Sequence, residues 1–257
     1  MGRKKKALSK SFHRLFQKKQ KGIAWLIDPA KFDKNLIPHI KSIRDSQLDF
    51  IFIGGSKYRD KNFDEVVFEI KNAAGNIPVL IFPGSKMQVS NHADGILFLS
   101  LLSGRNPEFL ISQQIAAAES IYHSELEVLP TAYLLVNDGE LKSVHRESNT
   151  LPILNKSIKE VVKTALAGKF LGMDLCFLDA GSGATSSVAT EVIQEVKKYL
   201  DGPLIVGGGI DNLQKIHLGF EAGADVIVIG NQIEKDPHFL TEVLSFKDWY
   251  NQSLHVN

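Results

Sequence analysis

Short runs rich in Ile, Val, Leu and Phe alternate with longer helical patterns from residue 23 to residue 230. The apolar runs are continuous rather than alternating, which is typical of strands buried on both faces of a parallel sheet. Eight runs are predicted as strands, at residues 23–27, 50–53, 79–82, 95–99, 132–136, 175–178, 204–206 and 226–229. Helical patterns lie between them at residues 34–46, 62–74, 107–122, 157–170, 188–199 and 212–222. Eight strand–helix units in a chain of 257 residues predict an α/β fold, a (β/α)8 TIM barrel.

A doubly wound open sheet is the alternative architecture. Its nucleotide-binding form carries G-x-G-x-x-G after the first strand, whereas Ile27 is followed here by Asp28, Pro29 and Ala30. No shift in composition indicates a linker within the barrel. We therefore predict two parts, a basic helix at residues 1–22 and a single barrel domain at residues 23–257.

The connection between the third and fourth strands is short. Only residues 83–93 separate them, and Pro83 and Gly84 form a turn, which leaves too few residues for a full crossover helix. We expect an irregular or missing third helix. One possibility is that the exposed flank forms a groove for a long apolar ligand. The alternative is that a shortened helix or an extra strand covers it.

The first 21 residues contain nine Lys and Arg residues and no acid, although the net charge of the whole chain is only +1. Leu8, Phe12, Leu15 and Phe16 share one face of a helix. We expect this face to pack on the barrel, with peripheral contact to an anionic membrane as the alternative. No nucleic-acid partner is expected, because no aromatic platform or binding motif accompanies the charge.

The composition, with 44% hydrophobic and 23% charged residues, is that of a soluble globular protein. Cys176 is the single cysteine, so no internal disulfide can form. The apolar runs are too short to span a bilayer and no leader sequence is visible, so we expect a cytoplasmic protein. The His residues show no metal-binding spacing, which argues against zinc.

Small and polar residues follow each predicted strand, at the end of the barrel where TIM-barrel enzymes carry their sites. Glycines after the last two strands predict a phosphate site there, although tight turns would also need them. Asp28 and Ser56 are candidate Mg²⁺ ligands, or else helix caps. Asp179 is a candidate base.

Taken together, six motifs resemble the geranylgeranylglyceryl phosphate synthase family, which are TIM-barrel prenyltransferases of ether-lipid synthesis. They are Ile27-Asp28-Pro29, Ile53-Gly54-Gly55-Ser56, Phe82-Pro83-Gly84, the segment from Phe177 to Ala184, Val206-Gly207-Gly208-Gly209-Ile210 and Ile229-Gly230-Asn231. The resemblance covers residues 23–245. It implies transfer of the prenyl group of geranylgeranyl diphosphate to the 3-hydroxyl of sn-glycerol 1-phosphate, with release of diphosphate.

The resemblance also implies roles for individual residues. Asp28 and Ser56 match the Mg²⁺ positions, and Asp179 matches the residue that deprotonates or orients the acceptor. The sn-glycerol 1-phosphate site would comprise Phe177, Leu178, Asp179, Ala180, Gly181, Ser182, Gly183, Gly208, Gly209, Gly230 and Asn231. The family often has Tyr and Glu where this chain has Phe177 and Asp179, and some relatives have Lys in place of Leu26.

Relatives assemble as dimers or hexamers, so we expect a homo-oligomer. Three other functions stay open at this stage: the same reaction with another prenyl length, a different phosphate-binding barrel enzyme, and a non-catalytic lipid binder at the membrane.

Overall fold

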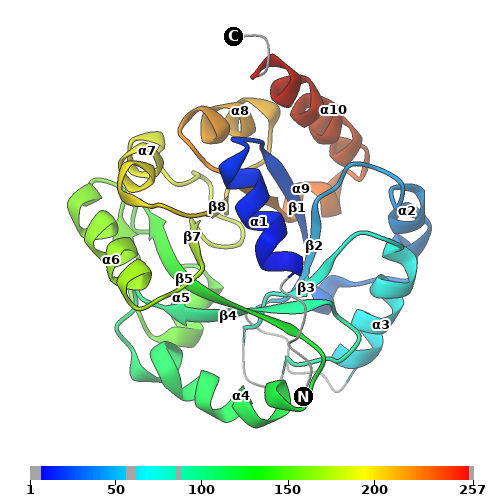
Figure 1. Cartoon of the computed structure of the whole chain (residues 1–257), viewed down its shortest axis with the longest axis horizontal. Coiled ribbons are helices and arrows are strands. Elements are labelled where there is room, and N and C mark those ends of the chain that lie inside the picture. The colour runs from blue at the N-terminus through cyan, green and yellow to red at the C-terminus, as the bar shows by residue number, and fades with distance from the viewer. Residues whose placement is uncertain (1–6, 56–61, 85–87, 255–257) are drawn as a thin grey trace.

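Eight parallel strands form a closed ring in the computed structural model, which describes residues 7–55, 62–84 and 88–254. The strands of the ring are β1 (Gly22–Ile27), β2 (Phe50–Ile53), β3 (Val79–Ile81), β4 (Gly95–Leu101), β5 (Glu127–Asn137), β7 (Leu175–Asp179), β8 (Leu204–Gly207) and β9 (Val226–Ile229). Each pairs with the next, β4 pairs with β5, and β9 closes the ring onto β1. Figure 1 shows the ring with helices around it. The predicted TIM barrel is confirmed.

The helices on the outside of the ring follow the predicted segments within a few residues. They are α2 (Leu36–Ser42), α3 (Phe63–Ala74), α4 (Gln113–Tyr122), α6 (Ile158–Phe170), α7 (Thr190–Tyr199) and α8 (Leu213–Glu221). Their apolar faces pack against the outward-pointing strand residues and form the larger of two hydrophobic cores. The smaller core fills the inside of the ring.

The connection from β3 to β4 has no helix in its described residues, 82–84 and 88–94. This agrees with the irregular third helix expected from the short spacing. Helix α3 contacts β3, and η2 and α4 contact β4, so the flank between the two strands has helices beside it but none from its own described connection.

The predicted helix at residues 107–122 begins differently from expectation. Residues Glu108–Ser112 form a π-helical turn (η2) before α4 starts. A π turn leaves backbone carbonyls without their usual helical partners, and side chains satisfy two of them here. The Ser100 hydroxyl donates to the Leu110 carbonyl at 2.7 Å, and the Gln114 amide donates to the Phe109 carbonyl at 3.3 Å. Such turns are frequent at functional sites.

Helix α9 (Asn231–Lys235) follows β9 directly. Three elements were not among the predicted strands and helices. They are α5 (Ser143–Ser148), β6 (Ile153–Leu154) and α10 (His238–Ser253). Two of them are short. The two residues of β6 pair only with the end of β5, outside the ring. Short elements of this kind carry too little periodicity to be recognised in a sequence.

Helix α1 (Ala7–Gln17) closes the end of the barrel where the strands begin, and it lies across the ring in Figure 1. Leu8, Phe12 and Leu15 are buried in the inner core, and the Phe12 ring stacks on Phe50 at 4.2 Å. The Glu127 carboxylate accepts the backbone N–H groups of Leu8 and Ser9, each at 2.8 Å. A carboxylate at the N-terminus of a helix stabilises it. The predicted apolar face of this helix thus packs on the barrel.

None of the helices in the described part of the chain has the length and apolarity needed to cross a membrane.

Candidate functional site

A cavity of about 610 Å³ opens where the strands of the ring end. Its volume is in the range of small-ligand sites. Most of the described residues that we expected in a site line this cavity: Asp28, Phe177, Asp179, Ser182, Gly183, Gly208, Gly209, Gly230 and Asn231. The ring thus brings together residues from both halves of the sequence at the predicted end of the barrel.

Three predicted acceptor-site residues do not line the cavity. The Leu178 side chain points outward into the core beneath the helices, because neighbouring residues of a strand face opposite sides. Ala180 is fully buried, with its N–H bonded to the Gly207 carbonyl at 3.0 Å. Gly181 donates its N–H to Asp179. These three residues support the loop, and Ser56 lies outside the described residues.

Asp179 is buried at the base of the cavity, with 8% of its surface exposed. Its Oδ1 accepts the N–H of Gly181 at 2.7 Å, and its Oδ2 accepts the Tyr133 hydroxyl at 2.6 Å. Burial raises the pKa of Asp179 above its usual range, while the hydrogen bonds from Tyr133 and Gly181 act in the opposite direction. A carboxylate held in this way can accept a proton from a bound hydroxyl.

Gly208 brings the backbone of the β8 loop against Asp179. Its φ of +79° is in the left-handed region, and a Cβ atom there would lie 2.5 Å from Asp179 Oδ1 and 2.6 Å from the Gly181 nitrogen. Only glycine fits at this position, since any side chain would collide with the carboxylate and with its backbone donor.

We expect Gly208→Val to lower both the stability and kcat, because the side chain displaces Asp179 as well as the loop. The left-handed φ alone should cost about 1–3 kcal/mol. Gly172 is a matched control, since its φ is +81° and nothing lies within 4 Å of its Cβ position. Gly172→Val should reproduce the strain without the collision. Equal thermal stability and equal kcat in the two variants would contradict this assignment.

Asp28 stands at the exit of β1 and is half-buried. Its Oδ1 accepts the N–H of Ala30 at 3.0 Å, so Asp28 caps the single helical turn η1 (Pro29–Lys31). Asp28 therefore acts as a helix cap, which was the alternative role considered for it. This hydrogen bond engages one of its two carboxylate oxygens. No group of three or more His, Cys, Asp or Glu side chains in the described part of the chain could hold a metal ion.

Lys31 is a residue of the cavity that sequence reasoning missed. Its Nζ lies 2.8 Å from Glu234 Oε2 and donates to Asn231 Oδ1 at 3.2 Å, so it joins η1 to the segment that follows β9. The sequence contains one signal for it, a cation three residues after Asp28. Its partners lie about 200 residues away and could not be inferred from spacing.

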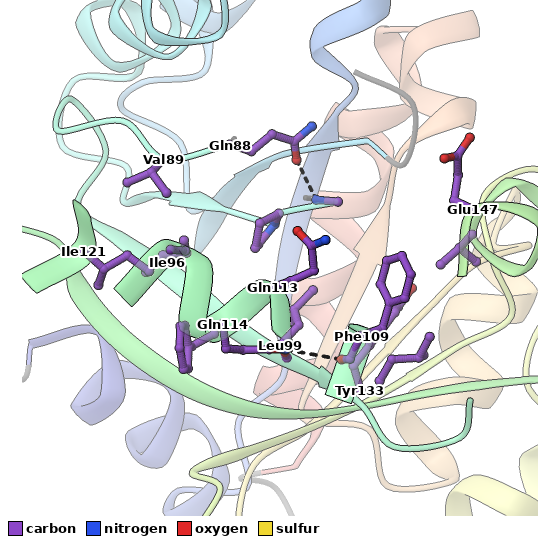
Figure 2. A pocket seen from close by; sticks show the side chains of 16 residues that line it. Gln88, Val89, Ile96, Leu99, Phe109, Gln113, Gln114, Ile121, Tyr133 and Glu147 are labelled. Atoms are coloured by element: carbon purple, nitrogen blue, oxygen red, sulfur yellow. Dashed lines mark hydrogen bonds between the residues drawn. The ribbon is translucent and has the colours of Figure 1, made fainter. Parts of the chain in front are cut away.

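A second, largely apolar pocket, called the groove below, lies between β4, the described residues that follow β3, and α4 (Figure 2). Ile96, Phe98, Ala117 and Ile121 are among the residues that line it. Five residues line both this groove and the cavity at the strand ends, called the mouth cavity below: Pro83, Gly84, Leu99, Tyr133 and Val144. The groove and the cavity therefore meet at the strand ends.

The order of strands in the ring places the groove opposite the glycine loops. The groove lies at β3 and β4, whereas Gly208 and Gly230 follow β8 and β9, on the other side of the ring. Tyr133 on β5 and Asp179 on β7 lie between the two sides. An apolar group in the groove and a compact anion at the glycine loops would thus lie on opposite sides and meet beside Asp179.

Comparison with known proteins identifies the family. The sequence profile described as the PcrB family matches residues 16–247. The chain belongs to the PcrB family. The match covers all eight strands of the ring, so the site and the groove both lie within the family's own region.

Named relatives agree with this assignment. The geranylgeranylglyceryl phosphate synthase of Chitinophaga pinensis is 41% identical over 239 residues, which cover 91% of this chain and 94% of that protein. The synthase of the same name from Zunongwangia profunda is 45% identical over 84% of this chain and 92% of its own length. Family membership at this identity confirms the expected resemblance and makes the chain a prenyltransferase.

A solved structure shares the fold. The (S)-3-O-geranylgeranylglyceryl phosphate synthase of Thermoplasma acidophilum, crystallised in complex with its substrate sn-glycerol-1-phosphate, superposes with a TM-score of 0.82 at 32% identity. The match covers 93% of this chain and 95% of that one.

Proposed function

We propose that the enzyme joins the prenyl group of geranylgeranyl diphosphate to the 3-hydroxyl of sn-glycerol 1-phosphate, giving geranylgeranylglyceryl phosphate and diphosphate. The observation that carries the proposal is the junction of an apolar groove with a polar cavity beside a buried carboxylate. The names of the relatives support it, and so does the ligand of the Thermoplasma acidophilum enzyme.

The acceptor phosphate binds on the side of β8 and β9, against the backbone of Gly208, Gly209 and Gly230. Backbone N–H groups at glycine loops can approach an anion closely because no side chain intervenes. Lys31 also lines this cavity, where its ammonium group is shared between Glu234 and Asn231. The glycerol end of the molecule then points back toward Asp179.

The prenyl tail lies in the groove, with its diphosphate at the mouth. The acceptor oxygen bonds to C1 of the prenyl group while the bond from C1 to the diphosphate oxygen breaks. The hydroxyl proton passes to Asp179, and the electron pair of the broken bond leaves with the diphosphate. The groove walls keep the tail out of water during the transfer.

Asp28 fits a Mg²⁺ site of the kind that uses few protein ligands. Its Oδ1 accepts the Ala30 N–H, and the described residues form no other hydrogen bond with this carboxylate, so Oδ2 can serve a ligand in the cavity that Asp28 lines. Mg²⁺ is commonly held by one or two carboxylates together with substrate phosphates, so a cluster of acids is not required. When bound, the ion neutralises the diphosphate and stabilises it as the leaving group. Ser56 stays a proposed second ligand.

We expect Asp28→Asn to lose turnover and its dependence on Mg²⁺ while binding sn-glycerol 1-phosphate normally. The amide can still accept the Ala30 N–H but is a poor ligand for Mg²⁺. Calorimetry with glycerol phosphate alone checks binding, and initial rates across a Mg²⁺ titration check the metal dependence. Wild-type rates at ordinary Mg²⁺ concentrations would remove Asp28 from the metal role.

Incubation of the enzyme with labelled sn-glycerol 1-phosphate, Mg²⁺ and prenyl diphosphates of several lengths tests the whole proposal. The geranylgeranyl ether should be the main product. A different preferred chain would keep the reaction and change the donor. Tail binding without any product would instead favour the non-catalytic lipid binder.

We also propose that the enzyme is a homo-oligomer in the cytoplasm. Phe170 and Leu171, at the end of α6, expose 79% and 71% of their surface in the single chain. Large exposed apolar side chains that lie together are typical of contact surfaces. Light scattering should give the mass of a dimer or a hexamer, and a monomer would contradict the proposal.

A further inference from the structure

Within the described ring, Tyr133 is the one residue on another strand whose side chain forms a hydrogen bond with Asp179. It lies on β5, 46 residues before Asp179, and its hydroxyl donates to Oδ2 at 2.6 Å. Only 5% of Tyr133 and 8% of Asp179 is exposed. Gly181 donates to Oδ1, so each carboxylate oxygen has one donor within the described residues, and the two donors together orient the carboxylate.

The Tyr133 ring is itself held in place by aromatic contacts. Phe82 and Phe177 meet it edge to face, with ring centroids 5.6 and 5.4 Å away. The ring lines both the mouth cavity and the apolar groove, and Figure 2 shows it close to Leu99 and Phe109 in the groove. Its hydroxyl is therefore fixed at the junction between the two binding regions.

We propose that Tyr133 is a positioning residue, which holds the Asp179 carboxylate toward the acceptor hydroxyl at the point where the groove and the cavity meet. This inference rests on the role proposed above for Asp179. Phe177, the neighbour of both side chains, has no hydroxyl, so it cannot take over this bond.

Tyr133 acts as a donor and not as a second base. Burial, followed by the charge and hydrogen bond of Asp179, raises the pKa of Tyr133 well above its usual value, so the phenol keeps its proton throughout the reaction. The same hydrogen bond lowers the pKa of Asp179, against the effect of burial. Removal of the hydroxyl should therefore raise the pKa of Asp179 and shift the acid limb of the pH profile to higher pH.

Other charged groups share the environment of Asp179 and are unchanged by this substitution. The Lys142 side chain lies against Gly181. The charged residues that line the cavity are Asp28, Lys31, Asp211, Glu234 and Lys235. A shift of the acid limb in a Tyr133 variant can then be assigned to the lost hydrogen bond.

The test is Tyr133→Phe, which keeps the ring and its contacts with Phe82 and Phe177. We expect kcat to fall about 10- to 100-fold, as for other hydrogen bonds to charged groups. The KM for sn-glycerol 1-phosphate should change much less, and the acid limb of kcat/KM should move to higher pH. Tyr250→Phe is the matched control, because Tyr250 donates to the Glu221 carboxylate at the same distance, 2.6 Å, outside the site.

Asp179→Asn is measured in parallel to separate this inference from the role of Asp179. An inactive Asp179→Asn beside a Tyr133→Phe with normal kcat and an unshifted acid limb would overturn the role of Tyr133 alone. A lower kcat of Tyr133→Phe with an unshifted acid limb of kcat/KM would also overturn the role of Tyr133, since altered packing would then explain the lower kcat. An active Asp179→Asn would show that the base assignment itself is wrong.

Discussion

Replacing Asp179 with asparagine should lower kcat by about 10²- to 10⁴-fold, the usual contribution of a general base. The fold should survive, because an amide satisfies the same partners. Its oxygen can accept the Gly181 N–H, and its NH₂ group can donate to the Tyr133 oxygen. What it cannot do is accept the proton of the acceptor hydroxyl. Single-turnover assays with saturating prenyl diphosphate, together with binding of sn-glycerol 1-phosphate, separate chemistry from affinity.

Asp179→Glu is the control for this substitution. It keeps the carboxylate, and the family resemblance implies that relatives often carry Glu at this position. The longer side chain must fit beside Gly208, whose Cβ position is only 2.5 Å from Asp179 Oδ1. We expect a turnover rate between those of the wild type and the Asn variant. A Glu variant as inactive as the Asn variant would mean that position, and not basicity, limits the rate.

The second large effect is on stability: Phe12→Ala should lower the free energy of unfolding by about 3–5 kcal/mol. The Phe12 ring is fully buried and stacks on Phe50, with an interplanar angle of 5°. Its removal leaves a cavity at the closed end of the barrel, where the strand ends and α1 cannot easily collapse around it. Urea denaturation measures the difference.

Phe16→Ala is the matched control on the same helix. Phe16 is only half-buried, and its ring faces Lys197 Nζ at 4.4 Å, a contact worth about 0.5–1 kcal/mol near the surface. Equal destabilisation by the two substitutions would contradict the packing of α1.

Deletion of residues 1–21 should lower stability or assembly more than it lowers affinity for anionic vesicles. The reason is that the side chains of Leu8, Phe12 and Leu15 already pack in the core of the barrel.

The positions of the strands could be predicted because they depend on local pattern. A strand covered on both faces needs a continuous apolar run, so β2 and β9 were predicted with their bounds unchanged. Polar and small residues after each run marked the end of the barrel that carries the site. The short spacing between β3 and β4 likewise indicated the irregular third helix, since chain length limits what a connection can form. Short elements such as β6 and the π turn before α4 were not predicted, because they depend on contacts with residues outside the segment.

The partners of several important side chains were decided only by the tertiary structure. Tyr133 and Asp179 are 46 residues apart, Glu127 and the start of α1 about 119, and Lys31 and Glu234 203. No local pattern relates such residues, because periodicity reports which face a residue occupies and not which distant residue it meets. The amino-acid sequence by itself therefore determined the barrel, the end that carries the site and the candidate base. Only the tertiary structure, by joining β9 to β1 and β5 to β7, decided which hydroxyl holds that base and which groove meets it.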